Sequence, residues 1–142
     1  MTDRQLAAKE YMEGYEEACR EVRLCEEQYE RESIQIDAVR SLSDNDGMPH
    51  GSGISRPTES KAIRLVDKRR RLDRARRKAY EKGVEIFDVA FYVGGIEGEI
   101  LIERYINLRG WDAIYKLVNY SESQTHRYHR TGLDKVADIL NL

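Results

Sequence analysis

The sequence has few cysteines, which cross-link small proteins, and no long apolar run, which would embed a protein in a membrane. It has two cysteines among 142 residues, Cys19 and Cys25, and their six-residue spacing within a helical pattern prevents a disulfide without distortion. The longest apolar or glycine run, Val89 to Ile96, is too short to span a membrane. The first residues also lack the order of a secretion signal. We therefore expect reduced thiols, no membrane segment and a cytoplasmic location.

Proline is also scarce, with two residues, whereas charged residues make up 35% of the chain and apolar residues 40%. This balance favours helices with narrow buried stripes over a compact β fold. The net charge of -2 hides a segregation, because residues 1–32 hold ten acidic and five basic residues, while residues 61–82 hold eleven basic and three acidic ones. The chain is therefore acidic at its start and strongly basic in its middle.

Patterns for catalysis are missing as well. The stretch Gly94-Gly95-Ile96-Glu97-Gly98 lacks the preceding strand and the spacing of a nucleotide-binding loop. His126 and His129, with Glu122 one turn earlier, have a helical metal-ligand spacing, but surface or DNA-facing histidines on a helix are far commoner. We predict no enzyme activity, no cofactor and no metal site.

A heptad pattern runs from residue 8 to residue 39. Nine of its ten a and d positions are apolar or aromatic, and the set comprises Ala8, Tyr11, Tyr15, Ala18, Val22, Cys25, Tyr29, Glu32, Ile36 and Val39. Such a stripe is typical of a long helix that packs lengthwise on a partner. We predict a long acidic helix over residues 1–42, packed either in an intrachain hairpin or across a homodimer.

The next segment is rich in turn formers and predicts a flexible linker over residues 43–57. A helix is expected over residues 58–93, capped by Thr58 and ended by Gly94 and Gly95. Its first half is basic and supplies five candidate DNA-phosphate contacts, namely Arg69, Arg70, Arg74, Arg77 and Lys78. Charge matching with the acidic first helix is the alternative, and the sequence leaves both open. The second half is apolar and is expected to be buried, including Val84, Phe87 and Phe91.

Residues 94–142 predict three helices with short connectors, over residues 96–107, 111–118 and 121–140, which is the length pattern of a helix-turn-helix domain. Ser121 and Gln124 match a capping box at the start of the third helix. Its inward positions are predicted to be Thr125, Tyr128, Gly132, Val136 and Leu140. The candidate DNA-binding residues are Ser121, Ser123, Gln124, His126, Arg127 and Arg130.

This region also resembles a known family. The residues that carry the resemblance are Arg104-Tyr105-Ile106, Gly110-Trp111-Asp112-Ala113-Ile114, Tyr120-Ser121, Arg127, and His129 followed by Leu133. They are similar to the C-terminal motif of phage-encoded late transcription regulators of the RinA and ArpU type, which are similar in turn to region 4 of bacterial sigma factors. The resemblance covers about residues 96–136. Tyr115 and Gly132 depart from the motif, which usually has alanine at both positions.

The resemblance implies a helical arm plus helix-turn-helix, double-stranded DNA as partner, and activation of phage or prophage late genes in a bacterial host cell. The expected fold is all-α, with a long N-terminal helical hairpin or coiled-coil arm followed by a C-terminal three-helix helix-turn-helix domain. Two other functions stay open. One is a DNA-packaging protein similar to a small terminase subunit, and the other is a sigma-like adaptor that binds RNA polymerase.

Overall fold

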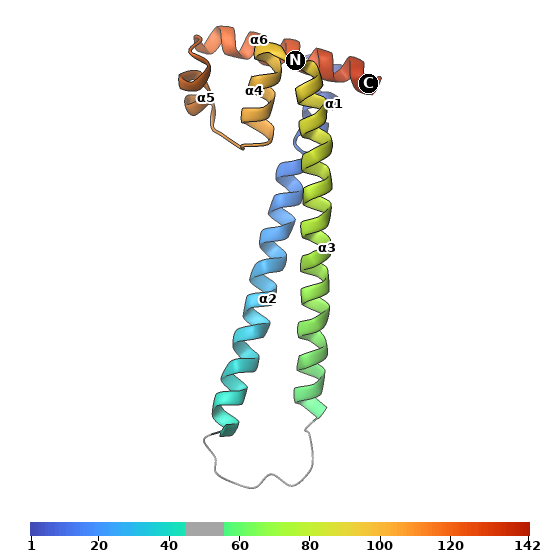
Figure 1. Cartoon of the computed structure of the whole chain (residues 1–142), viewed down its shortest axis with the longest axis vertical. Helices are drawn as coiled ribbons and strands as arrows, with labels where there is room; N and C mark the ends of the chain where they lie inside the picture. Colours follow the sequence, from blue (N-terminus) through green and yellow to red (C-terminus); the bar gives the residue numbers. More distant parts are fainter. Residues whose placement is uncertain (45–55) are drawn as a thin grey trace. The chain divides into compact units, whose positions relative to one another are not determined.

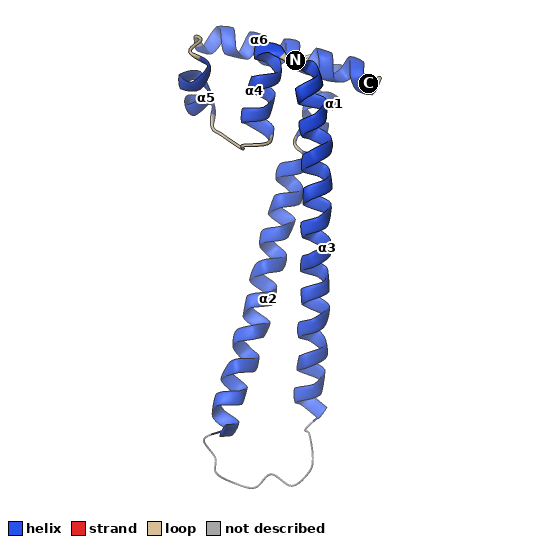
Figure 2. Cartoon of the chain, viewed as in Figure 1, coloured by secondary structure: helices blue, strands red, loops and turns tan. Residues whose placement is uncertain are grey.

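A computed structural model describes residues 1–44 and 56–142, and within these ranges the chain is helical with no strand (Figure 2). The all-α prediction is therefore confirmed. The helices are α1 (Asp3–Met12), α2 (Gly14–Asp44), α3 (Arg56–Val93), α4 (Gly95–Tyr105), α5 (Trp111–Val118) and α6 (Glu122–Leu140) (Figure 1). None of these helices is long and apolar enough to cross a membrane.

The predicted linker over residues 43–57 falls mostly on residues outside the described ranges. Its edges are helical, however, because residues 43–44 belong to α2 and residues 56–57 to α3. Pro57 stands in the first turn of α3, where the missing backbone N–H costs no hydrogen bond. Thr58 therefore lies inside α3, and the prediction that it caps this helix is wrong.

The described chain forms two compact units. Unit 1 comprises residues 1–19 and 78–142, and unit 2 comprises residues 20–77. The segment predicted as the C-terminal domain, residues 94–142, is thus joined in unit 1 by α1, the first residues of α2 and the last part of α3.

The predicted helix over residues 1–42 is divided at Glu13 into α1 and α2. Glu13 keeps right-handed helical angles, with φ of -71° and ψ of -10°, so the helix bends there without reversing. Gly14 follows, and glycine lowers the cost of leaving a regular helix. At the other end of α1, Thr2 and Gln5 form a capping box. The bend allows α1 to pack on α6 within unit 1.

The core of unit 1 is built by α1, α3, α4 and α6. Its buried members are Ala8, Met12, Ile86, Ala90, Leu101, Tyr105, Leu133, Val136 and Ala137. Gly98 permits a close approach of α4 to α3, because a Cβ atom there would lie 2.6 Å from the Ala90 carbonyl oxygen. A second cluster of Ile100, Ile114 and Val118 joins α5 to α4.

The corner between α3 and α4 is made by Gly94 and Gly95, as the sequence predicts. Their φ angles are 65° and 62°, in the left-handed region that glycine enters without steric cost. The predicted ends of α4, α5 and α6 differ from the observed ones by at most two residues.

In unit 2 the heptad stripe of α2 packs on α3 of the same chain. Val22, Cys25, Tyr29 and Glu32 are half-buried there and Ile36 is buried, while α3 contributes Leu72 and Ala75. Arg76 of α3 forms an ion pair with Glu26 of α2 at 3.1 Å, and the Arg69 guanidinium lies 5.5 Å from the centre of the Tyr29 ring. Within this unit the stripe therefore serves the intrachain hairpin, and charge matching between the two helices contributes to it.

The apolar second half of α3 is not buried throughout, which corrects the sequence prediction. Ile86 and Ala90 are fully buried, but Val84, Phe87 and Phe91 are exposed. The helical period explains the difference, because residues one or two positions away from 86 and 90 point to another side of α3. A segment dense in apolar residues does not reveal which side of the helix is covered by neighbouring helices.

Candidate nucleic-acid interface

A three-residue turn joins α5 to α6. Asn119 ends α5 in the left-handed conformation, with φ of 62° and ψ of 33°, and this angle is tolerated by asparagine more readily than by most residues. Ser121 is extended and caps α6, since its Oγ accepts a hydrogen bond from the Gln124 backbone N–H at 3.2 Å. Among the described residues, only this serine half of the predicted capping box is formed, so the Gln124 side chain is left at the surface.

The N-terminal half of α6 has one exposed and one buried face. Ser121, Ser123, Gln124, Arg127 and Arg130 are exposed, as their positions in the sequence predict. On the opposite face Thr125, Gly132 and Val136 are buried and Tyr128 and Leu140 are half-buried, so the predicted inward set is largely correct. We call Ser121, Ser123, Gln124, Arg127 and Arg130 the polar face of α6.

His126 differs from the other candidate DNA contacts. It is half-buried, its ring lies 4.4 Å from the Trp111 ring, and its Nε2 is 2.6 Å from the Tyr115 hydroxyl oxygen. The side chain is thus engaged in the contact between α5 and α6 and does not belong to the polar face. We therefore no longer count it as a DNA contact.

His129, expected on the surface, is 2% exposed and forms part of the core. Its Nε2 lies 2.8 Å from the hydroxyl oxygen of Tyr105 in α4, and its ring meets the edge of the Trp111 ring at 4.9 Å. Burial lowers the pKa of His129 to about 4, with the nearby His126 adding to the effect, so the imidazole is neutral at ordinary pH. Burial also raises the pKa of Tyr105.

Trp111 is the centre of this aromatic cluster. Besides the two histidines it stacks with Tyr115 at 6.3 Å, and the Arg104 guanidinium lies over its ring at 5.0 Å. The spacing of His129 could have revealed its burial, because it lies four residues after Thr125 and four before Leu133, both inward. By contrast, a single sequence does not indicate which residues of other helices contact Trp111.

Tyr115 and Gly132, the two residues that depart from the family motif, each make a contact with a neighbouring helix. The large Tyr115 side chain is accommodated between α5 and α6 by its hydrogen bond to His126. At Gly132 a Cβ atom would lie 3.2 Å from Leu101 Cδ1 and 3.3 Å from Glu97 Cβ, so glycine allows a close contact of α6 with α4.

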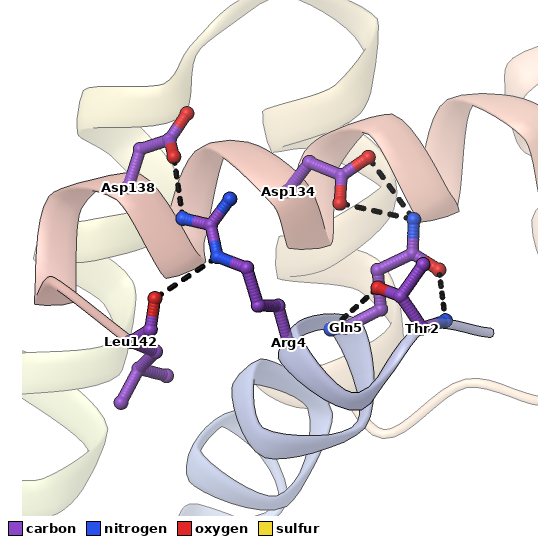
Figure 3. A network of polar contacts seen from close by, with 6 residues as sticks. All are labelled: Thr2, Arg4, Gln5, Asp134, Asp138 and Leu142. Atoms are coloured by element: carbon purple, nitrogen blue, oxygen red, sulfur yellow. Dashed lines mark hydrogen bonds and ion pairs between the residues drawn. The ribbon is translucent and has the colours of Figure 1, made fainter.

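The C-terminal half of α6 carries two carboxylates that bind side chains of α1 (Figure 3). Arg4 forms an ion pair with Asp138 at 2.6 Å and also donates to the Leu142 carbonyl oxygen at 2.9 Å. The Gln5 side-chain amide donates to both carboxylate oxygens of Asp134 at 3.0 Å. These contacts leave the basic polar face as the part of α6 that is open to an anionic partner.

Comparison with protein-family models, curated proteins and solved structures found no match.

The candidate phosphate contacts of α3 have different surroundings. Arg69 pairs with Asp73 at 3.4 Å in addition to its contact with Tyr29. Arg70, Arg74 and Arg77 are exposed and form no ion pair with another described residue. Their spacing places them on one side of α3 in unit 2. Lys78 is exposed as well and begins the α3 segment of unit 1.

Proposed function

We propose that the chain is a sequence-specific DNA-binding transcription regulator in which α5 and α6 act as a helix-turn-helix and α6 is the recognition helix. The observation that carries the proposal is the polar face of α6, which is exposed and lies at the N-terminal end of the helix directly after a short turn. Recognition helices present their base-contacting residues at this end.

The side chains of the polar face have the chemistry that base recognition needs. Arg127 and Arg130 can each donate a two-pronged hydrogen bond to guanine, and Gln124 can pair with adenine in the same way. Ser121 and Ser123 stand at the helix N-terminus, where hydroxyl and backbone N–H groups bind phosphate. Arg127 points most directly away from the buried side of α6 and is our first candidate for a base contact.

The surroundings of α6 support the same function. The Trp111 cluster fixes α5 against α6, and a recognition helix has to be held rigidly for its side chains to keep their register with the bases. The ion pair of Asp138 with Arg4 reduces the repulsion that this carboxylate would exert on phosphate.

We further propose that Arg70, Arg74 and Arg77 in unit 2 contribute non-specific phosphate contacts. Each phosphate that a basic side chain neutralises releases condensed counterions, which favours binding at low salt. The family resemblance adds the biological setting: activation of phage or prophage late genes in the cytoplasm of a bacterial host, with RNA polymerase as a further partner.

The test is fluorescence anisotropy with a duplex enriched by selection from a random library and with a random duplex, over a salt series. We expect Arg127→Ala to weaken binding to the selected duplex by about 1 to 3 kcal/mol and binding to the random duplex much less, because a base contact acts only on the correct sequence. Arg23→Ala is the control, since it removes the same charge from an exposed position of α2.

Equal losses on the two duplexes would reduce Arg127 to a phosphate contact. No binding even at low salt would contradict the proposal and favour the adaptor function, in which the chain binds RNA polymerase. A triple variant of Arg70, Arg74 and Arg77 to alanine should lower the salt dependence of binding to both duplexes, by roughly one released counterion for each lost contact.

A further inference from the structure

An exposed apolar stripe runs along the part of α3 that belongs to unit 1. It consists of Tyr80, Val84, Phe87 and Phe91, with exposed fractions of 73%, 44%, 40% and 71%. Their spacing of four, three and four residues places all of them on one side of the helix. A contiguous apolar patch of this kind on a soluble chain marks an interaction surface, whereas single exposed apolar residues do not.

Two hollows lie along this stripe. The first has a volume of about 240 Å³ and is lined by Tyr15, Tyr80, Gly83, Val84, Phe87 and Ile106. The second has a volume of about 450 Å³ and is lined by Ala90, Phe91, Gly94, Gly95, Gly98, Glu99, Ile102 and Glu103. Both exceed the roughly 150 Å³ that suffices for a benzene ring. The first is walled mainly by apolar groups, while the second contains two carboxylates.

We propose that the occupant of this surface is a second copy of the chain, bound with its α3 antiparallel to the first. A two-fold axis through the middle of the stripe places Tyr80 of each copy opposite Phe91 of the other, and Val84 opposite Phe87. The contact is then isologous, with the same residues used by both copies.

The chemistry of the two hollows favours this antiparallel register. Phe91 of one copy meets the first hollow of its partner, which offers apolar walls to an apolar ring. Tyr80 meets the second hollow, where its hydroxyl can donate a hydrogen bond to the exposed Glu99 carboxylate. A parallel register would instead bring Phe91 against Phe91 and leave Glu99 without a donor from the stripe.

The size of the stripe fits a dimer that depends on concentration. Aromatic side chains bury about 150 to 250 Å² each, so the exposed parts of Tyr80, Phe87 and Phe91 offer roughly 300 to 450 Å² per copy. With their neighbours, two copies approach the roughly 1,000 Å² of a specific interface. This surface differs from the N-terminal heptad stripe, the dimer surface that the sequence suggested, which packs on α3 of the same chain in unit 2.

The first experiment is sedimentation equilibrium of the full chain without DNA. We expect a monomer–dimer equilibrium, and Phe91→Glu should raise its dissociation constant by about tenfold or more because it places a charge in the mainly apolar first hollow of the partner. Tyr92→Glu is the matched control: it adds the same charge at the next residue, which is 80% exposed and lies off the stripe. The control should leave the constant unchanged, and circular dichroism should show the same helix content for both variants.

A wild-type chain that stays monomeric at all accessible concentrations would overturn the proposal. Equal effects of the two variants would do so as well, because the contact would then not involve the stripe. A ring of many subunits would also overturn it and would favour the DNA-packaging function.

A second experiment tests the register. In a background of Cys19→Ser and Cys25→Ser, chains with Tyr80→Cys and chains with Phe91→Cys are mixed and oxidised. We expect the mixed disulfide to accumulate well above either self-disulfide, because positions 80 and 91 are opposed only in the antiparallel pair. Efficient self-crosslinking of Phe91→Cys alone would point to parallel copies and contradict the proposal.

The inference does not rest on DNA binding, and its failure leaves that function intact. The two also respond differently to salt. Association through an apolar stripe should change little between low and moderate salt, whereas DNA binding should fall steeply.

Discussion

The two units of this chain share α3 but pack it in different surroundings. In unit 2, residues 20–77, α2 and α3 bury one stripe between them, and much of each helix stays exposed. In unit 1 four helices enclose a core in which Met12, Ile86, Leu101 and Leu133 have no exposed surface. Two helices can bury only the sides that face each other, so the buried apolar surface per residue, and with it the local stability, should be larger in unit 1.

The two units also differ in the roles proposed for them. The closely packed unit 1 carries the proposed recognition helix, which needs fixed side-chain positions. Unit 2 carries Arg70, Arg74 and Arg77, which need only charge to contact phosphate. Three predictions test or sharpen this contrast.

The largest effect is expected for Leu101→Ala in the core of unit 1. Truncation of a fully enclosed leucine should lower the free energy of unfolding by about 3 to 5 kcal/mol, because α4 is packed against three other helices in this core and the resulting cavity cannot collapse. Leu72→Ala in unit 2 is the matched change, and it should cost about 2 to 3 kcal/mol since two helices can relax toward each other. Urea unfolding measures both, and equal losses would show that the two units are packed alike.

The second prediction concerns pH and unit 1 alone. The pKa of His129 is about 4 in the folded chain and about 6.5 when unfolded, so the unfolded state binds more protons between these values. Stability is therefore fully present above pH 6.5 and should fall by up to about 3 kcal/mol as the pH drops to 4. Trp111, the only tryptophan, lies beside His129 and reports the unfolding by fluorescence.

His129→Gln should be less stable at neutral pH but should lose most of this pH dependence. If the wild-type chain keeps the same free energy of unfolding from pH 7 to pH 4, His129 is not held neutral by burial. Such a result would also argue against close packing around His129 in the core of unit 1.

The third prediction compares two glycines within unit 1. Gly98→Ala should cost about 1 to 3 kcal/mol, because the new Cβ meets a backbone oxygen at 2.6 Å that can move only with α3. Gly132→Ala should stay within about 1 kcal/mol of neutral, since the helix preference of alanine offsets its tight contact with the Leu101 side chain. Thermal unfolding followed by circular dichroism measures both, and the opposite ranking would mean that α6, not α3, sets the position of α4.

Much of the local structure could be predicted from the sequence. Gly94 and Gly95 located the corner after α3, and the spacing of Ser121 and Gln124 located the start of α6, because both signals act over a few residues. The contacts of α1 with α6 could not be predicted, since Arg4 and Asp138 are 134 positions apart and carry no mutual signal.

The candidate site shows the same limit. Periodicity along α6 was enough to separate Arg127 from Thr125, since each position depends only on the helix itself. It could not show that His126 binds Tyr115 or that Phe91 is exposed, because both depend on which other helix lies nearby. A single sequence therefore predicts which residues share one side of a helix better than it predicts which residues contact that side.

The contact between α1 and α6 has a consequence for synthesis of the chain. A ribosome makes α1 before the other helices and α6 after them, so Ala8 and Met12 remain uncovered by α6 until its residues leave the exit tunnel. The residues of unit 2 are consecutive, and its hairpin can form earlier. Unit 1 is therefore expected to fold last, and a nascent chain that stalls before residue 133 would still expose Ala8 and Met12 of its N-terminal helix to chaperones and proteases.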